Sequence, residues 1–217
     1  MTFTPIKTPL VAKKLFPNYV WDISTTEKVI YLTFDDGPTP EITNWTLSVL
    51  KEYNAKATFF SIGKNIKNHP DIFQNVLNDG HAIGNHTQNH IKGWKNSANA
   101  YLKNTLEAQE VIEKQLQNSE FRIQNLFRPP YGQITPKQGK KLIELGYKIV
   151  MWDVLSFDWD KNITQEACYN NVISKAKNGS IIVFHDSVKA SKNMQYALPK
   201  VLKYFSKEGY RFKSLEF

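Results

Sequence analysis

The chain has 217 residues, of which 41% are hydrophobic and 13% aromatic, which suits one domain with a sizeable core or one domain with a short extension. One cysteine, Cys168, excludes an internal disulfide and a cysteine-based metal cluster. No apolar run approaches the roughly 18 residues of a transmembrane helix, which excludes a membrane span.

The formal net charge of +8 raises the question of a polyanionic partner. The lysines are scattered and do not alternate with aromatic residues, so we predict a solvated basic surface and no nucleic-acid partner. Prolines and Lys13-Lys14 break the N-terminal stretch, which lacks the uninterrupted apolar run of a signal peptide. We therefore expect a cytoplasmic protein, with association with the cell envelope as the alternative, and we expect a monomer.

Residues 1–27 are predicted to form an irregular N-terminal arm. The apolar residues of this segment predict that it packs onto the rest of the chain: Leu10, Val11, Leu15, Phe16, Val20 and Trp21.

From residue 28 onward, short apolar runs alternate with longer amphipathic stretches. The apolar runs predict strands over 29–34, 57–62, 81–85, 125–128, 148–154, 180–185 and 211–215. The amphipathic stretches predict helices over roughly 41–53, 65–79, 97–117, 136–146, 164–178 and 192–208. This alternation predicts a parallel α/β sheet, either doubly wound or closed into a barrel.

Parallel α/β sheets carry their functional residues at the carboxyl ends of the strands. Asp35 and Asp36 end the first predicted strand, and His86 and His90 follow the third. Arg128 ends the fourth predicted strand and His185 ends the sixth. Three of the five histidines therefore fall at one predicted edge of the sheet.

The segment HTQNH places His86 and His90 four residues apart, so on one helical turn both rings would face the same way. Two imidazoles and a carboxylate suit Zn²⁺, Co²⁺, Ni²⁺, Mn²⁺ or Fe²⁺ better than Mg²⁺ or Ca²⁺. Only one of Asp35 and Asp36 needs to bind such an ion, and the other can then accept a proton. A bound cation would also relieve the repulsion between these neighbouring carboxylates.

Three further residues complete the predicted site. Arg128 precedes two prolines that restrict its backbone, and its guanidinium can hold a carboxylate by paired hydrogen bonds. Tyr131 can turn a backbone N–H toward a developing oxyanion. His185 is either a general acid or a core histidine. The neighbouring Asp186 is predicted to cap the next element.

Four sequence motifs, in their order along the chain, resemble those of the polysaccharide deacetylase family, also called carbohydrate esterase family 4 or the NodB homology domain. The resemblance covers residues 28–217, and it rests on TFDDGP (33–38), HTQNH (86–90), RPPYG (128–132) and IVFHDS (182–187). It implies a catalytic domain with a distorted (β/α) barrel, similar to a TIM barrel, of about seven strands. It also implies one divalent metal ion, usually zinc, with cobalt or nickel as alternatives.

The resemblance also implies roles for individual residues. Asp35 is the implied catalytic base, oriented by Arg128, and His185 is the implied general acid. Tyr131 supplies a backbone N–H to the oxyanion. The implied metal ligands are Asp36, His86 and His90.

One motif departs from the family pattern, in which many members have an Asp, two residues, and then Asp-Trp. The segment LSFDW places Leu155 at the first Asp, while Asp158 and Trp159 keep their places. The resemblance implies that the missing Asp tunes the catalytic histidine, so His185 is expected to lack its usual partner. Asp153, on the same side of the predicted strand as Leu155, is the candidate substitute.

The implied activity is hydrolysis of an acetyl group from an acetylated oligo- or polysaccharide, either an N-acetylated amino sugar or an O-acetyl sugar. Trp94, Trp152 and Trp159 can line the sugar-binding groove together with Tyr131. Each is also a candidate core aromatic, and Trp152, in the middle of a predicted strand, is expected in the core. Leu155 favours one alternative, a catalytically silent carbohydrate-binding relative. A metal-dependent phosphatase is disfavoured, because its two aspartates are separated by one residue and those of DDG are adjacent.

Overall fold

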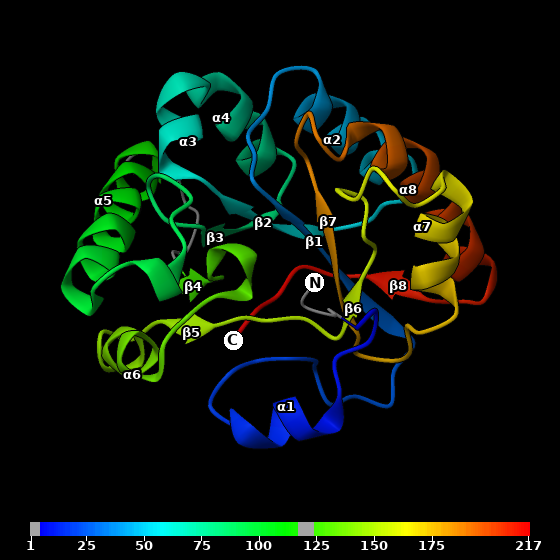
Figure 1. The fold of residues 1–217 in the computed structure, drawn as a ribbon. Helices are drawn as coiled ribbons and strands as arrows, with labels where there is room; N and C mark the ends of the chain where they lie inside the picture. The colour runs from blue at the N-terminus through cyan, green and yellow to red at the C-terminus, as the bar shows by residue number, and fades with distance from the viewer. Residues whose placement is uncertain (1–4, 117–123) are drawn as a thin grey trace.

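The structure is a computed structural model that describes residues 5–116 and 124–217 (Figure 1). The strands are β1 (Val29–Asp35), β2 (Ala57–Ser61), β3 (Ala82–Asn85), β4 (Leu126–Phe127), β5 (Lys148–Ile149), β6 (Val154–Leu155), β7 (Ile181–His185) and β8 (Arg211–Phe212). The helices are α1 (Leu10–Leu15), α2 (Ile42–Glu52), α3 (Gly63–Asn68), α4 (Pro70–Asn78), α5 (Ala98–Leu116), α6 (Pro136–Glu144), α7 (Gln165–Ile173) and α8 (Ser191–Lys207). Short 3₁₀ turns cover Gly93–Lys95 and Pro130–Gly132.

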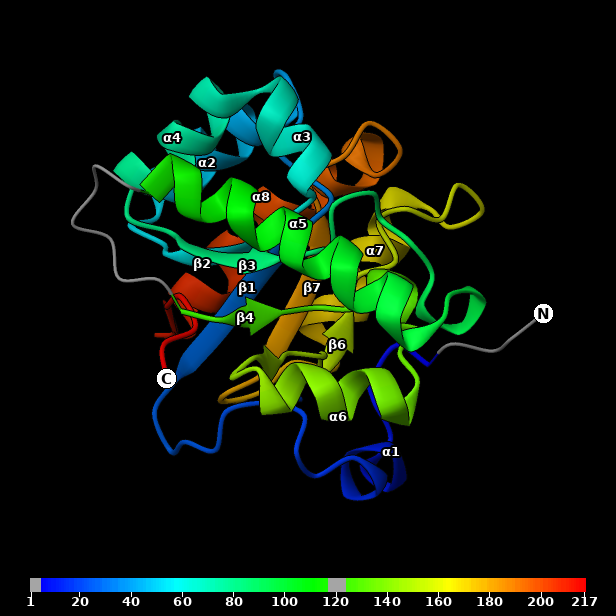
Figure 2. The ribbon, with the colours of Figure 1, turned by 90° about the vertical axis from the view of Figure 1, so that its left-hand side faces the viewer.

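Seven parallel strands form a curled sheet in the order β5-β4-β3-β2-β1-β7-β6, and β8 pairs in parallel with the start of β1. Helices cover the outer side of this sheet, with α5 lying across β3 in Figure 2. Helices join each strand to the next along the chain, except that β5 runs into β6 through a short irregular segment. The architecture confirms the predicted distorted (β/α) barrel and settles the choice against a doubly wound sheet.

The core lies between the central strands and the helices outside them. Phe34 of β1 is fully buried and stacks between Phe59 of β2, at 5.0 Å between ring centroids, and Phe184 of β7, at 6.1 Å. These three rings hold the central strands in register. The strand ends that follow are therefore rigidly placed.

Two predicted elements are each divided in the structure. The predicted strand 148–154 becomes β5 and β6, which do not pair with each other among the described strands. The predicted helix 65–79 becomes α3 and α4, because Pro70 has no N–H to continue the first helix and restricts His69 before it.

The N-terminal arm contacts β5, β6 and the segment between them through its backbone and two lysines. Several of its apolar side chains pack against the core, and they include the predicted Val20 and Trp21: Ile6, Tyr19, Val20, Trp21 and Ile23. Leu10, Val11 and Leu15 are 72%, 67% and 68% exposed, so the prediction that these three residues pack onto the domain is wrong. They lie on α1, which bulges away from the barrel at the bottom of Figure 1. Among the described residues, no helix combines the length and the apolar character needed to cross a bilayer.

Substituting Phe34 by alanine should lower the free energy of unfolding by about 3–5 kcal/mol, because a buried ring is lost and a cavity remains between Phe59 and Phe184. Urea denaturation followed by circular dichroism measures this change. Val188→Ala is the control: its side chain is 75% exposed, so it should shift stability by less than about 0.5 kcal/mol. Equal effects of the two substitutions would contradict the assignment of Phe34 to the core.

Candidate metal centre and active-site cleft

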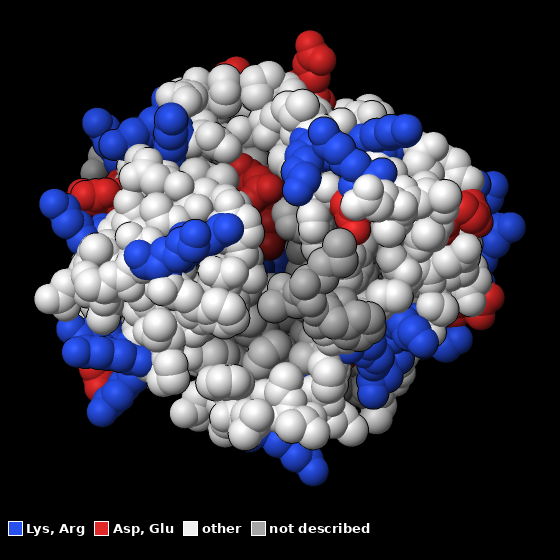
Figure 3. Space-filling model, in the orientation of Figure 1, with Lys and Arg blue, Asp and Glu red and all other residues white. Residues whose placement is uncertain are grey.

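A cavity of about 480 Å³ opens where the carboxyl ends of the strands converge. Acidic side chains lie within the hollow of this face in Figure 3, and lysine and arginine side chains surround it. Six of the predicted site residues line the cavity directly: Asp35, Asp36, His86, His90, Tyr131 and His185. The seventh, Arg128, is fully buried behind the wall.

Asp36, His86 and His90 converge on one point of the cavity. One ligand atom from each lies within 4.8 Å of the other two. Asp36 Oδ1 is 3.2 Å from His90 Nε2 and 3.8 Å from His86 Nε2. Ligand atoms on a tetrahedral zinc ion lie about 3.3 Å apart, given bond lengths of about 2.0–2.1 Å. The predicted triad is therefore brought together with a spacing that suits a small divalent ion.

The chemistry of the donors also fits a cation. Asp36 Oδ1 is buried, yet it has no hydrogen-bond partner among the described residues. The backbone carbonyl of Arg128 accepts a hydrogen bond from His86 Nδ1 at 2.8 Å, which leaves the lone pair of Nε2 free on the cavity side. Burial lowers the pKa of His86 and lowers that of His90 to about 4, so both rings are neutral at pH 7 and can act as ligands.

The turn that carries the two histidines is not helical, so the predicted helical turn is wrong. Thr87 and His90 both have positive φ, at 65° and 53°. The side chain of Asn85 accepts a hydrogen bond from the Thr87 N–H at 2.8 Å and supports the turn. The rings nevertheless lie with centroids 5.0 Å apart, tilted by 45°, because the tight turn brings them to the same side.

Arg128 holds Asp35. Its Nη1 donates to Asp35 Oδ1 at 2.7 Å and to the Thr33 hydroxyl at 2.6 Å. Its Nε and Nη2 donate to the carbonyls of Val150 and Met151, at 3.2 and 2.8 Å. The fully buried guanidinium thus holds a carboxylate as predicted, but through one hydrogen bond and not the predicted pair, because Nη2 donates to the Met151 carbonyl.

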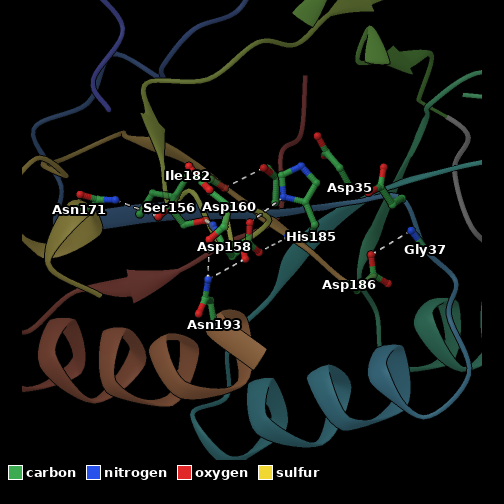
Figure 4. A network of polar contacts seen from close by, with 12 residues as sticks. Asp35, Gly37, Ser156, Asp158, Asp160, Asn171, Ile182, His185, Asp186 and Asn193 are labelled. Atoms are coloured by element: carbon green, nitrogen blue, oxygen red, sulfur yellow. Dashed lines mark hydrogen bonds and ion pairs between the residues drawn. The ribbon is translucent and has the colours of Figure 1, made fainter. Parts of the chain in front are cut away.

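His185 has a carboxylate partner, which is Asp158 (Figure 4). One oxygen of Asp158 pairs with His185 Nδ1 at 2.8 Å, and the other accepts from the His185 backbone N–H at 2.6 Å. Burial alone would lower the pKa of His185, but the charge of Asp158 outweighs it and raises that pKa to about 9. The expectation that His185 lacks its partner is therefore wrong.

Asp153 is not the substitute that the sequence suggested. Its carboxylate accepts a hydrogen bond from the hydroxyl of Ser180, the residue before β7, at 2.6 Å. His185 lies at the other end of that strand, so Asp153 is one strand length away from it. Leu155 lines the cavity, so this chain has an apolar side chain at that point of the wall.

Asp186 holds the turn after β1. It accepts hydrogen bonds from the Gly37 N–H at 3.0 Å and from the Thr43 hydroxyl at 2.6 Å, so the predicted capping role is wrong. A Cβ atom at position 37 would overlap the Asp186 carboxylate, which explains the glycine in DDG. Burial raises the pKa of Asp186 to about 8. This residue fixes the backbone that presents Asp35 and Asp36.

Aromatic side chains form the walls of the cavity. Trp94, Tyr131, Trp152 and Trp159 all line it. Trp152, which was expected in the core, packs against a core cluster and also faces the cavity. Tyr131 has φ 60°, which places its side chain over His90 with ring centroids 4.6 Å apart. Gly132 lies against the Trp152 ring, where a Cβ would clash.

Sequence reasoning missed the roles of Asp158, Asp186 and Thr33. For Asp158 a signal was present, because the residue directly precedes the cavity-lining Trp159 in the loop after β6. No local pattern indicated the contacts of Asp186 or Thr33. The partners of Asp186, Gly37 and Thr43, lie 149 and 143 residues away along the chain. The partner of Thr33, Arg128, lies 95 residues away.

Comparison with known sequences identifies the class of protein that has this site. A family model described as polysaccharide deacetylase matches residues 22–150. A peptidoglycan-N-acetylglucosamine deacetylase of Bacillus cereus is 39% identical over 208 residues, covering 94% of this chain and 94% of that protein. The chain belongs to the polysaccharide deacetylase family, a family of carbohydrate deacetylases.

Two further similarities agree with this membership. The peptidoglycan-N-acetylmuramic acid deacetylase PdaC of Bacillus subtilis is 33% identical over 189 residues, which are 87% of this chain but 38% of PdaC. The crystal structure of the Bc1960 peptidoglycan N-acetylglucosamine deacetylase superposes with a TM-score of 0.86 at 32% identity, covering 96% of this chain and 95% of that one.

Replacing His90 by alanine should weaken binding of Zn²⁺ or Co²⁺ by about 100-fold or more, because one of three protein ligands is removed. Isothermal titration of metal into the chelator-treated protein measures the affinity. His69→Ala is the matched control, since His69 lies between α3 and α4 and outside the cavity. Unchanged affinity in the His90 variant would contradict the ligand set.

Proposed function

We propose that this chain is a metal-dependent deacetylase that removes the acetyl group from N-acetylated amino sugars of peptidoglycan. One observation carries the proposal: a three-ligand metal site lies beside a carboxylate held by arginine and a histidine held by carboxylate. The peptidoglycan substrate is supported by the relatives, two of which are named for acting on N-acetylglucosamine or N-acetylmuramic acid in that polymer.

Asp36, His86 and His90 would hold the metal ion, and zinc suits this set of two imidazoles and one carboxylate, with cobalt or nickel as alternatives. A bound ion of this kind supplies Lewis acidity, which lowers the pKa of water and polarises a carbonyl. A site with three protein ligands leaves a position open for this chemistry.

The remaining site residues handle protons and charge. Asp35, oriented by Arg128, accepts the proton of the attacking water. The Tyr131 backbone N–H donates a hydrogen bond to the oxyanion of the tetrahedral intermediate. His185, kept protonated by Asp158, gives its proton to the leaving amine of the sugar. Base and acid are thus each held by an oppositely charged partner.

Asp35→Asn should lower kcat for acetate release by about 100-fold or more, because the amide cannot accept the proton of water. Acetate released from peptidoglycan and from N-acetylated chito-oligosaccharides measures the rate, and metal analysis checks that the ion is retained. Asp71→Asn, an exposed position at the start of α4, should keep full activity. Full activity of the Asp35 variant with metal bound would overturn the base assignment.

Asp158→Asn should move the alkaline limb of the pH–rate profile toward lower pH. A general acid works only while protonated, so activity is lost as pH rises through the pKa of His185, about 9 in the native site. Without the Asp158 charge, that pKa should fall toward or below the ordinary value of about 6.5. Asp160→Asn makes the same charge change two residues away and should leave the limb in place. A limb that does not move in the Asp158 variant would rule out His185 as the acid.

A further inference from the structure

The segment that joins β5 to β6 lies between the N-terminal arm and Arg128. The two strands do not pair with each other among the described strands, and the arm fills the space between them. On the β5 side, Val20 donates its N–H to the Ile149 carbonyl at 2.8 Å and accepts from the Met151 N–H at 2.7 Å. Figure 1 shows this dark blue arm below β5 and β6.

The arm also pairs with the β6 side of the same segment. The Thr8 N–H donates to the Asp153 carbonyl at 2.8 Å, and the Thr8 hydroxyl donates to the Trp152 carbonyl at 2.7 Å. The Leu155 N–H donates to the Ile6 carbonyl at 2.8 Å. The arm therefore takes up backbone groups of β6 that a neighbouring strand would otherwise satisfy.

Arg128 bonds two carbonyls of the segment between β5 and β6. The carbonyls of Val150 and Met151 accept hydrogen bonds from its guanidinium and not from the arm. The same guanidinium orients Asp35. A displacement of Val150 and Met151 would therefore reach the carboxylate through one rigid, fully buried side chain.

A buried ion cluster fastens the arm to this segment. The Asp153 carboxylate is fully buried, and it accepts from Lys13 Nζ at 2.6 Å and from Lys7 Nζ at 2.9 Å. Lys13 also pairs with Asp22 of the arm. Burial by itself would raise the pKa of Asp153 and lower that of Lys13. The hydrogen bonds and opposite charges of the pair outweigh burial, so the pKa of Asp153 is lowered, the pKa of Lys13 is raised, and both residues stay charged. Removing Lys13 leaves the buried Asp153 carboxylate with Lys7 and the Ser180 hydroxyl only, which weakens the attachment of the arm to this segment.

We propose that the N-terminal arm is a wall of the barrel that positions Arg128, and that Lys13 is a positioning residue acting through the Val150 and Met151 carbonyls. Thr8 and Lys13 precede the residues that the family model matches, so this role belongs to a part of the arm outside that match. The step from Arg128 to turnover rests on the proposed function, whereas the step from the arm to Arg128 does not.

The first test follows Arg128 itself and needs no substrate. The chain has three arginines, so a ¹⁵N–¹H spectrum contains few Nε–H signals, and Arg128→Lys identifies the one from Arg128. Lys13→Met should accelerate hydrogen exchange of that signal by about tenfold or more, because the carbonyl of Val150 becomes mobile. Lys13→Arg should restore slow exchange, and Lys14→Met, an exposed neighbour, should leave it unchanged. Unchanged exchange in Lys13→Met, or equal acceleration in Lys14→Met, would overturn the proposal.

The second test follows turnover. Lys13→Met should lower kcat by about tenfold while KM changes less than about twofold, because Asp35 is misplaced and the sugar-binding wall is retained. In an Arg128→Lys background the same substitution should change kcat by less than about twofold. Equal losses in both backgrounds would mean that the arm does not act through Arg128.

The two tests also separate this proposal from the proposed function. A parent protein that releases no acetate, with Arg128 exchange still governed by Lys13, would refute the proposed function alone. Should Lys13→Met be unable to fold, Thr8→Val removes only the hydrogen bond to the Trp152 carbonyl and is tested for the same acceleration.

Discussion

The buried guanidinium of Arg128 is the interaction on which the rest of the site depends. It connects three parts of the barrel, because it bonds Thr33 and Asp35 of β1 and the two carbonyls after β5, and it lies 4.1 Å from the Phe60 ring. Burying a cation is costly unless each of its donors finds a partner. The partners present here leave Asp35 one geometry, which a surface ion pair could not enforce.

The histidines of the cleft show how one residue type acquires two chemistries. Burial keeps His86 and His90 neutral, and this protonation state suits metal ligands. His185 is half-buried, and the charge of Asp158 together with its hydrogen bond to Nδ1 keeps the ring protonated. A carboxylate bonded to Nδ1 therefore distinguishes His185 from His86, whose Nδ1 donates to a backbone carbonyl.

The loops that carry these groups are held in unusual backbone conformations. Several residues at or beside the cleft have positive φ although they are not glycine: Asp36, Thr87, His90, Tyr131 and Phe157. Each such conformation costs on the order of 1–3 kcal/mol and persists only when the surroundings enforce it. The stacked core rings and the hydrogen bonds of Asp186 and Asn85 supply that enforcement. The stability of the barrel thus sustains the strain of the site.

The sequence by itself determined the parallel α/β class and the residues at the carboxyl edge of its sheet, whereas the barrel followed from the family resemblance. Alternating apolar and amphipathic stretches specify parallel strands, and the carboxyl ends of such strands meet at one edge, so Asp36, His86 and His90 could be placed together from local patterns. Only the tertiary structure decided the partners of those residues. The bond of Asp158 to His185, the position of Asp153 among the lysines of the arm, and the division of β5 from β6 depend on contacts between distant segments. Such contacts leave no periodic trace in the sequence, because they are set by where the curled sheet brings backbone groups that need partners.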